Sequence, residues 1–386
     1  MDNNLTRQKN LLLVIVTLFW FAQYVYVPFQ TPYLLTMQVS SSMVGIIMGV
    51  YGFSQMALRM PVGVMADLNG RHKLFIMTGV LASGLASVFR IVLSPEEGFL
   101  LGNILSGFAS AMWISFMVLY ASYFAKEQMQ KAMGLIVASN NIGILGGFVV
   151  STLFYDSFGM HFLCLLSIIS GILAIILSVF IKEAPKEKKI VPKISSLIKV
   201  YLDKRLIFFA VLILIQQGIM MATSMSFTMQ VAYNLNANAW QIGLLSIIFI
   251  VSAVIASYFA SSEFAQRQGA KFWIPAIMFA LAVYCFAVPN ITVVNILIAV
   301  QILSGISSGV LFSFCTTEAL RNVPMEKRST AMGYFQAIYA VGMTLMPIIA
   351  GFMSQNYGLT TAFYSEGVTA LVGTVAAILF FRRSVK

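Results

Sequence analysis

Charged side chains are scarce in this sequence. Asp, Glu, Lys and Arg make up 10% of its 386 residues, whereas 59% of the residues are hydrophobic. A soluble globular protein carries about 25% charged residues, so the composition argues against a water-soluble fold. The mean hydropathy of +0.88 points the same way. We therefore expect an integral membrane protein.

Imidazole and thiol groups are also few, with two His and three Cys in the chain. Cys164, Cys285 and Cys315 each fall inside an apolar run and show no pairing pattern, which argues against a disulfide framework and a structural zinc site. The apolar runs also lack pairs of Asp, His or Ser and Lys at a spacing suited to catalysis. We expect a protein that is not an enzyme and that needs no metal or cofactor.

The sequence contains many long apolar runs. A helix of about 20 apolar residues crosses the ~30 Å hydrocarbon core of a bilayer. The first run follows ten polar residues and is too long for a signal-peptide core, so we expect it to remain as a membrane helix. The twelve predicted spans are 11–36, 43–66, 74–93, 98–124, 130–155, 160–181, 205–232, 240–262, 272–288, 291–320, 330–354 and 360–381.

The net charge of +11 is distributed in step with these spans. If the N-terminus is cytoplasmic, every Lys and Arg except Arg90 falls on or near the cytoplasmic side, and Glu96, Glu97 and Asp156 fall on the other side. This asymmetry is the positive-inside pattern of a multi-pass membrane protein. A nucleic-acid partner is therefore not expected. We predict a protein of the cytoplasmic membrane, surrounded by lipid, with both termini inside.

The chain also repeats itself. The stretch ILSGFASAMWISF from Ile104 matches ILSGISSGVLFSF from Ile302, an offset of 302 − 104 = 198. After the next cytoplasmic loop the offset becomes 199, as between Gly134 and Gly333. Two parallel halves with a binding site between them, near the bilayer midplane, are typical of one large class of secondary transporters. The predicted parts are an N-terminal six-helix half (1–181), a basic cytoplasmic linker (182–204) and a C-terminal six-helix half (205–386).

The stretch GVMADLNGRHK, Gly63 to Lys73, concentrates charge and glycine between the second and third spans. Asp67 ends a helix that runs inward, where the helix dipole favours cations, so its carboxylate needs a partner such as Arg71. Gly63 lets a neighbouring helix approach closely, and Gly70 allows a tight reversal of the chain. These features suggest that the stretch makes a specific contact with another helix or loop on the cytoplasmic side.

This pattern resembles the loop between helices 2 and 3 of the major facilitator superfamily. KEQMQKAMG and PMEKRSTAMG resemble that family's loops 4–5 and 10–11, and IKEAP resembles the segment after its sixth helix. The resemblance implies an all-α membrane fold of twelve helices, in two six-helix repeat halves around a central cavity, that works by alternating access. It also implies a cytoplasmic gate in which Asp67 meets the region from Ser329 onward. The alternative is a stretch that only anchors the loop. The residues of this gating motif are Gly63, Asp67, Gly70, Arg71 and Lys73.

The sequence departs from the family pattern at three places. Asn103 stands where many proton-coupled members have an arginine, and Ile144 replaces the proline of the exporters' glycine–proline motif. The second copy of the loop, SSEFAQRQGAKF, has no aspartate in register. The expected gate is therefore asymmetric, and export is only slightly favoured over uptake.

In this fold, helices 1, 4, 7 and 10 line the cavity. Polar and aromatic residues recur on equivalent faces of these helices in both halves, with further amides in helix 5. For each residue alone, helix–helix hydrogen bonding is the alternative role. The near absence of charge among them suits a neutral or amphipathic organic molecule. The predicted cavity residues are Gln23, Tyr26, Gln30, Trp113, Tyr120, Asn140, Asn141, Gln217, Ser224, Thr228 and Tyr339.

Ionisable residues inside a membrane are candidates for function. Glu318, on a helix expected to line the cavity, is the candidate to carry a coupling proton, and an ion pair with Arg321 is the alternative. Glu366 and Arg90 fall on helices that are peripheral in the family. We expect Arg90 to extend toward the membrane interface.

Together these features predict a monomeric secondary active transporter of a small organic solute. A proton is expected as the coupling ion in preference to sodium. Two alternatives stay open: a flippase for a lipid or a lipid-linked molecule, and a symporter for solute uptake. The sequence does not name the substrate.

Overall fold

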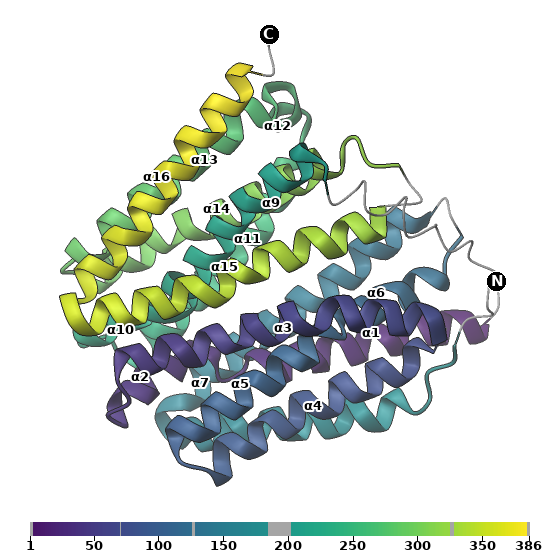
Figure 1. Cartoon of the computed structure of the whole chain (residues 1–386). Helices are drawn as coiled ribbons and strands as arrows, with labels where there is room; N and C mark the ends of the chain where they lie inside the picture. Colours follow the sequence, from purple (N-terminus) through teal and green to yellow (C-terminus); the bar gives the residue numbers. More distant parts are fainter. Residues whose placement is uncertain (1–2, 70, 126–127, 184–201, 325–327, 384–386) are drawn as a thin grey trace. The chain divides into compact units, whose positions relative to one another are not determined.

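The computed structural model describes residues 3–69, 71–125, 128–183, 202–324 and 328–383. These parts form helices joined by short connections, and they contain no strand (Figure 1). Most of the predicted linker, 182–204, lies outside the described residues, as does Gly70 of the gating motif.

The helices follow the apolar runs of the sequence. These runs form helices because a backbone that crosses lipid must satisfy its own hydrogen bonds. The elements in chain order are α1 (Asn3–Tyr24), α2 (Val27–Thr36), α3 (Ser41–Asn69), α4 (His72–Val92), α5 (Pro95–Ala111), α6 (Trp113–Ser122), α7 (Met129–Ser178), α9 (Lys204–Ala222), η2 (Thr223–Phe227), α10 (Thr228–Asn234), α11 (Ala239–Ala260), α12 (Glu263–Gln268), α13 (Ala270–Ala287), η3 (Val288–Asn290), α14 (Val294–Leu320), α15 (Arg328–Tyr357) and α16 (Leu359–Arg383).

Eleven helical segments within the described residues are long and apolar enough to cross a membrane. One of them, Lys131–Ser178, is 48 residues long and therefore holds two crossings, since about 20 residues suffice for one. The break between them is Gly159, whose φ of 69° lies in the left-handed region that glycine tolerates. The predicted all-α fold of twelve crossings is confirmed, with two of the crossings in one long helix.

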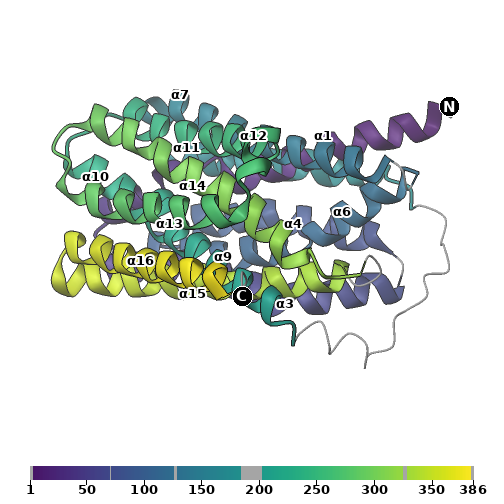
Figure 2. The same ribbon diagram turned by 90° about the horizontal axis from the view of Figure 1, so that it is seen from above.

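The chain divides into two compact units. The first unit contains residues 1–33 and 53–189, and the second contains residues 34–52 and 190–386. In the first unit, α1 packs along α7, and α4 contacts both α5 and α7. In the second unit the main pairs are α9 with α15, α11 with α14, and α13 with α16, and the last pair lies side by side in Figures 1 and 2. The predicted boundaries between halves and linker stay a prediction.

Glycines at one repeat position allow an equivalent pair of helices to approach closely in each unit. A Cβ added at Gly143 of α7 would lie 2.4 Å from the backbone oxygen of Thr17 in α1. A Cβ added at Gly342 of α15 would lie 2.1 Å from the backbone oxygen of Leu214 in α9. Gly143 and Gly342 are separated by the repeat offset, 342 − 143 = 199. The duplicated sequence thus produces a duplicated helix contact.

The first part of α3 belongs to the second unit because it packs tightly on α15. A Cβ added at Gly45 would lie 2.2 Å from the backbone oxygen of Pro347, and one added at Gly49 would lie 2.5 Å from that of Thr344. The amide of Ser42 also donates to the Gln355 side chain at 3.1 Å. Residues with larger side chains at these two glycine positions would separate the helices.

Candidate functional site

The first membrane segment of each repeat is interrupted at the same place. α1 ends at Tyr24 and α2 begins at Val27. Pro28 explains this break, because proline has no N–H to donate and its ring clashes with the carbonyl four residues earlier. In the second repeat, α9 passes into the π-helical turn Thr223–Phe227. Interrupted membrane helices and π-helical turns are frequent at binding sites.

A buried polar cluster lies at the break in the first unit. Gln23 of α1 donates to the Ser106 carbonyl at 2.9 Å and to the Ser110 hydroxyl at 3.1 Å. The Tyr26 hydroxyl lies 3.4 Å from the Ser106 hydroxyl. These contacts join the break in the first membrane segment to α5. We call the set Gln23, Tyr26, Arg90, Asn103, Ser106 and Ser110 the first-half cluster.

Arg90 of α4 is the cation of the first-half cluster. Its guanidinium donates to the Asn103 Oδ1 at 2.9 Å, to the Ser106 hydroxyl at 2.9 Å and to the Ser87 hydroxyl at 3.1 Å. Its central carbon lies 4.0 Å from the centroid of the Tyr26 ring, a cation–π arrangement. All the partners among the described residues are neutral.

The expectation that Arg90 extends to the membrane interface is wrong. Its side chain is 3% exposed. The inward direction is possible because Gly102 of α5 leaves room: a Cβ there would lie 2.9 Å from the guanidinium carbon. Arg90 therefore brings a guanidinium to Asn103, the position at which the family pattern places an arginine. Sequence reasoning missed this residue, since a lone arginine on a peripheral helix carries no pattern of its own.

A second buried cluster lies at the break in the second unit. The Tyr284 hydroxyl of α13 donates to Gln301 Oε1 at 2.8 Å, lies 2.7 Å from the Thr228 hydroxyl, and accepts a hydrogen bond from Ser224 at 3.2 Å. Ser224 also hydrogen-bonds to Ser304 of α14. We call the set Ser224, Thr228, Tyr284, Gln301 and Ser304 the second-half cluster. It contains no charged side chain.

The two clusters occupy equivalent positions in the repeat. The offset of 198 pairs Asn103 with Gln301 and Ser106 with Ser304. It also pairs Tyr26 with Ser224. The bridging side chain comes from α4 in the first half, where it is Arg90, and from α13 in the second half, where it is Tyr284. Each unit thus holds a hydrogen-bonded centre at the break in its first membrane segment.

The structure places four predicted cavity residues, Gln23, Tyr26, Ser224 and Thr228, in these clusters. Gln30 is buried in α2. Trp113, Tyr120 and Tyr339 are also buried, and they pack against the aromatic rings of Trp20, Phe124 and Phe335 respectively. Asn140, Asn141 and Gln217 are half-buried, Asn140 and Asn141 in α7 and Gln217 in α9. Their role in a cavity stays a prediction.

The gating motif lies at the junction of α3 and α4. Gly63 and Asp67 belong to the last two turns of α3, and the structure does not describe their side chains. Arg71 occupies the N-cap position of α4 and is exposed. Lys73 contacts the end of α7, where its ammonium donates to the Val179 carbonyl. The motif is therefore attached to α7 through Lys73.

Glu183 completes this attachment. Its carboxylate accepts a hydrogen bond from the Lys73 amide at 2.6 Å, in the first turn of α4. Negative charge there stabilises the helix, because the first amides of a helix lack internal partners. Tyr123 donates to the adjacent Lys182 carbonyl at 2.5 Å.

Glu318, the predicted proton carrier, lies in the last turn of α14 and binds two guanidinium groups. Its carboxylate forms an ion pair with Arg205 of α9. One carboxylate oxygen also lies 3.6 Å from a guanidinium nitrogen of Arg321, one turn further along the chain. Its backbone oxygen also accepts from Arg205 at 3.1 Å. These contacts favour the ion-pair alternative for Glu318, while its proposed role in coupling stays untested.

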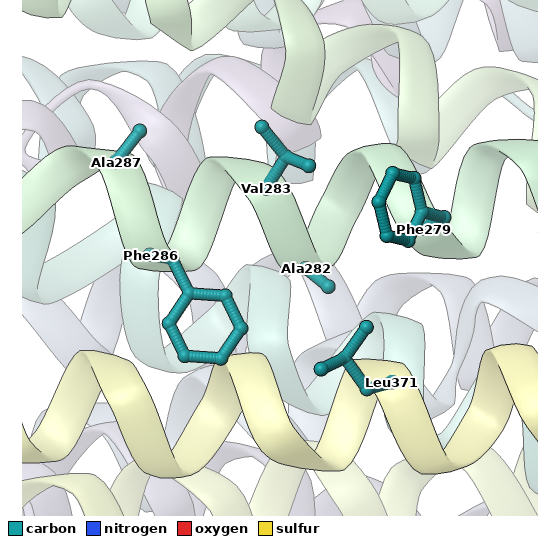
Figure 3. Close-up of a pocket in the computed structure, with 6 residues that line it drawn as sticks. All are labelled: Phe279, Ala282, Val283, Phe286, Ala287 and Leu371. Atoms are coloured by element: carbon teal, nitrogen blue, oxygen red, sulfur yellow. The ribbon is translucent and has the colours of Figure 1, made fainter.

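An apolar pocket of ≈ 380 Å³ lies between α13 and α16 (Figure 3). Five of its lining residues come from α13 and one, Leu371, comes from α16. The lining side chains carry no hydrogen-bonding group. The pocket therefore offers a surface for hydrocarbon and no means of orienting a polar solute. The lining residues are Phe279, Ala282, Val283, Phe286, Ala287 and Leu371.

The sequence and the fold both resemble known transporters. The family model described as Major Facilitator Superfamily matches residues 12–262 and 219–386. An uncharacterized MFS-type transporter of Methanocaldococcus jannaschii is 23% identical over 366 residues, which cover 92% of this chain and 93% of that protein.

Two solved structures share the fold at low sequence identity. A bacterial homolog of the human lysosomal transporter Spinster, in an inward-facing and unoccupied conformation, superposes with a TM-score of 0.80 at 13% identity and covers 99% of this chain and 98% of its own. The nucleoside transporter NupG superposes with a TM-score of 0.76 at 14% identity and covers 98% of this chain and 100% of its own. With the family model matched across both repeats, the chain belongs to the major facilitator superfamily and is a membrane transporter.

Proposed function

We propose that this protein is a secondary active transporter that moves a small neutral or amphipathic organic solute across the cytoplasmic membrane by alternating access. The observation that carries the proposal is the pair of buried clusters at equivalent breaks in the two repeats. Transporters of this kind place their substrate near the midplane, beside discontinuous helices. The clusters present hydroxyl, amide and aromatic groups, with Arg90 as their one charged member.

These groups support the choice of substrate class. Hydroxyl and amide groups recognise a solute that both donates and accepts hydrogen bonds. The Arg90 guanidinium already donates to Ser87, Asn103 and Ser106. A substrate with two or three negative charges would need further cations, which the clusters do not supply. A neutral or amphipathic molecule fits this donor set better.

The finer features of the proposal rest on the sequence. The charge asymmetry supports cytoplasmic termini, the gating motif supports alternating access, and a proton is preferred to sodium as the coupling ion. Export is slightly favoured over uptake, and the protein acts as a monomer. The apolar pocket between α13 and α16 supports lipid or lipid-linked molecules as the second substrate class.

The proposal is tested by transport into and out of sealed vesicles that contain the purified protein. A panel of neutral and amphipathic compounds, lipids and dicarboxylates is measured with and without an imposed pH gradient. Nucleosides belong in the panel because NupG, which shares the fold, is a nucleoside transporter. We expect at least one neutral or amphipathic compound to move faster than in protein-free vesicles. Transport of dicarboxylates alone would contradict the proposed substrate class.

The same assay tests the gate. Asp67→Asn removes the charge of the gating motif and keeps the size of the side chain. We expect slower transport and a changed ratio of inward-facing to outward-facing protein, measured by the accessibility of cysteines introduced on either side. Unchanged rates and an unchanged ratio would show that the motif only anchors the loop.

A further inference from the structure

Glu366 of α16 is an acid buried inside the second unit. Its side chain is 1% exposed, and neither carboxylate oxygen has a hydrogen-bond partner among the described residues. Buried carboxylates in proteins are normally paired with a cation or hydrogen-bonded, because desolvation of an unpaired charge is costly. A protonated carboxyl group avoids that cost.

The neighbouring helices supply no counter-charge at this depth. Cys285 is buried in α13, which packs against α16. The hydroxyl of the adjacent Tyr284 is hydrogen-bonded within the second-half cluster. Lys271 lies in the first turn of α13, more than three turns from Cys285.

The other helices packed against α16 give the same result. The cations of α9, Lys204 and Arg205, lie in its first turn. The Arg205 guanidinium is 5.9 Å from the ring centroid of Phe380, about four turns along α16 from Glu366. In α15 the one charged residue, Arg328, begins the helix. η3 has no ionisable side chain. A proton is therefore the counter-charge that this site accommodates.

The repeat shows what the position does in the other half. Ser87 and Ser167 stand at the equivalent positions, since 285 − 87 = 198 and 366 − 167 = 199. Ser87 donates to Ser167 at 2.8 Å, and Ser167 donates to the backbone oxygen of Ala22 at 2.6 Å. Ser87 in turn accepts from Arg90. In the first half this position is thus one hydrogen bond away from the polar cluster.

In the second half the same position holds an acid and a thiol. Cys285 replaces Ser87 and directly follows Tyr284, the centre of the second-half cluster. Glu366 replaces Ser167, which donates a hydrogen bond to the first membrane segment of its own half. A protonated carboxyl can donate in the same way, and a carboxylate cannot. Gain or loss of the proton therefore changes both the charge of this buried position and its ability to donate a hydrogen bond.

We propose that Glu366 is a proton-binding site and that it couples proton movement to transport. The coupling part of this inference rests on the proposed function, and the proton-binding part does not. A bound sodium ion would need several oxygen ligands, in the manner of hard cations. No group of acidic, His or Cys ligands occurs in the searched part of the chain, residues 3–383 without the gaps given above. The burial of a single acid without a counter-charge therefore favours a proton as the ligand of this site.

The binding part is tested without any substrate. The full chain in lipid vesicles is treated with an apolar carbodiimide, which reacts with protonated carboxyl groups, at a series of pH values. Mass spectrometry then locates the label. We expect label on Glu366 that declines as the pH rises, whereas the ion-paired Glu318 stays unlabelled. Absence of label on Glu366 would overturn the inference. Label that does not change with pH would overturn the claim that Glu366 exchanges its proton with the medium.

The coupling part uses the compound that wild-type vesicles transport. Glu366→Gln copies the size and neutrality of the protonated acid, so we expect folded protein that still exchanges the compound without a gradient. It should lose the stimulation by an imposed pH gradient. Glu263→Gln, which changes an exposed acid of the same unit, should keep that stimulation. Comparison with Glu318→Gln tests Glu318 as the alternative proton carrier.

The outcomes separate the two proposals. Full stimulation in Glu366→Gln would overturn the coupling role even if the residue is labelled. If the wild-type protein transports no compound of the panel, the proposed function fails. The labelling experiment still decides whether Glu366 binds a proton.

Discussion

The duplicated glycine contacts give a prediction that can be worked out in detail. Replacing Gly143 or Gly342 by alanine places a methyl group 2.4 or 2.1 Å from a backbone oxygen of the facing helix. A backbone atom cannot rotate away as a side chain can, so the helices must separate. Such overpacking costs about 1–3 kcal/mol. Alanine also returns about 1 kcal/mol of helix propensity relative to glycine.

The chain supplies a matched control for each substitution. Gly134 and Gly333 lie nine residues before Gly143 and Gly342 in the same helices, and a Cβ at either would meet no atom within 4 Å. Alanine there brings the helix-propensity gain alone. We therefore expect a net loss of up to about 2 kcal/mol at Gly143 and Gly342, from the difference between the two terms, and a small gain at the control positions.

The assay is thermal unfolding of the detergent-solubilised protein, followed by the fraction that remains monodisperse in size-exclusion chromatography. The four single variants should fall into two pairs, with the control variants at or above the wild-type midpoint and the contact variants below it. If Gly143→Ala and Gly342→Ala match their controls, the close helix contacts in both units are refuted.

Three further predictions concern hydrogen-bonded polar groups of the two units. Tyr284→Phe leaves buried partners without their hydroxyl and should lower the melting temperature, at about 1–3 kcal/mol per unsatisfied group, whereas Tyr364→Phe, at an exposed hydroxyl, should change it little. Arg90→Lys cannot reproduce the donor geometry of a guanidinium, so it should reduce both stability and transport more than Arg267→Lys, whose side chain is 82% exposed. Glu183→Gln removes negative charge from the first turn of α4 and should cost about 0.3–1 kcal/mol, detected as faster backbone hydrogen exchange in that turn. Unchanged exchange there would contradict the capping role of Glu183.

The sequence was sufficient for the fold because the membrane imposes a simple rule. Every crossing needs about 20 apolar residues, and such runs can be recognised without knowing what they contact. The repeat offset then identified pairs such as Asn103 and Gln301, although it did not show that they lie in hydrogen-bonded clusters. In α7 the break at Gly159 falls between the predicted spans 130–155 and 160–181, although the helix continues up to that residue.

The bridging residues could not be found in the same way. Arg90 and Tyr284 come from α4 and α13, helices that the family pattern places at the periphery, and they do not pair with each other in the repeat. Their roles depend on the direction in which each side chain points and on how far it extends. Arg90 turns inward because Gly102 leaves space for its guanidinium. Neither the spacing of apolar residues nor the charge pattern of the loops contains this information.

The most direct test of the account is transport by cluster variants of the repeat pair. Asn103→Leu and Gln301→Leu each replace a buried amide by an apolar side chain of similar size, at equivalent positions of the two halves. In sealed vesicles, the wild-type protein should move a neutral or amphipathic compound in response to a pH gradient, and both variants, when still monodisperse, should move it much more slowly. Equal rates for all three proteins would contradict the proposal that each cluster takes part in transport.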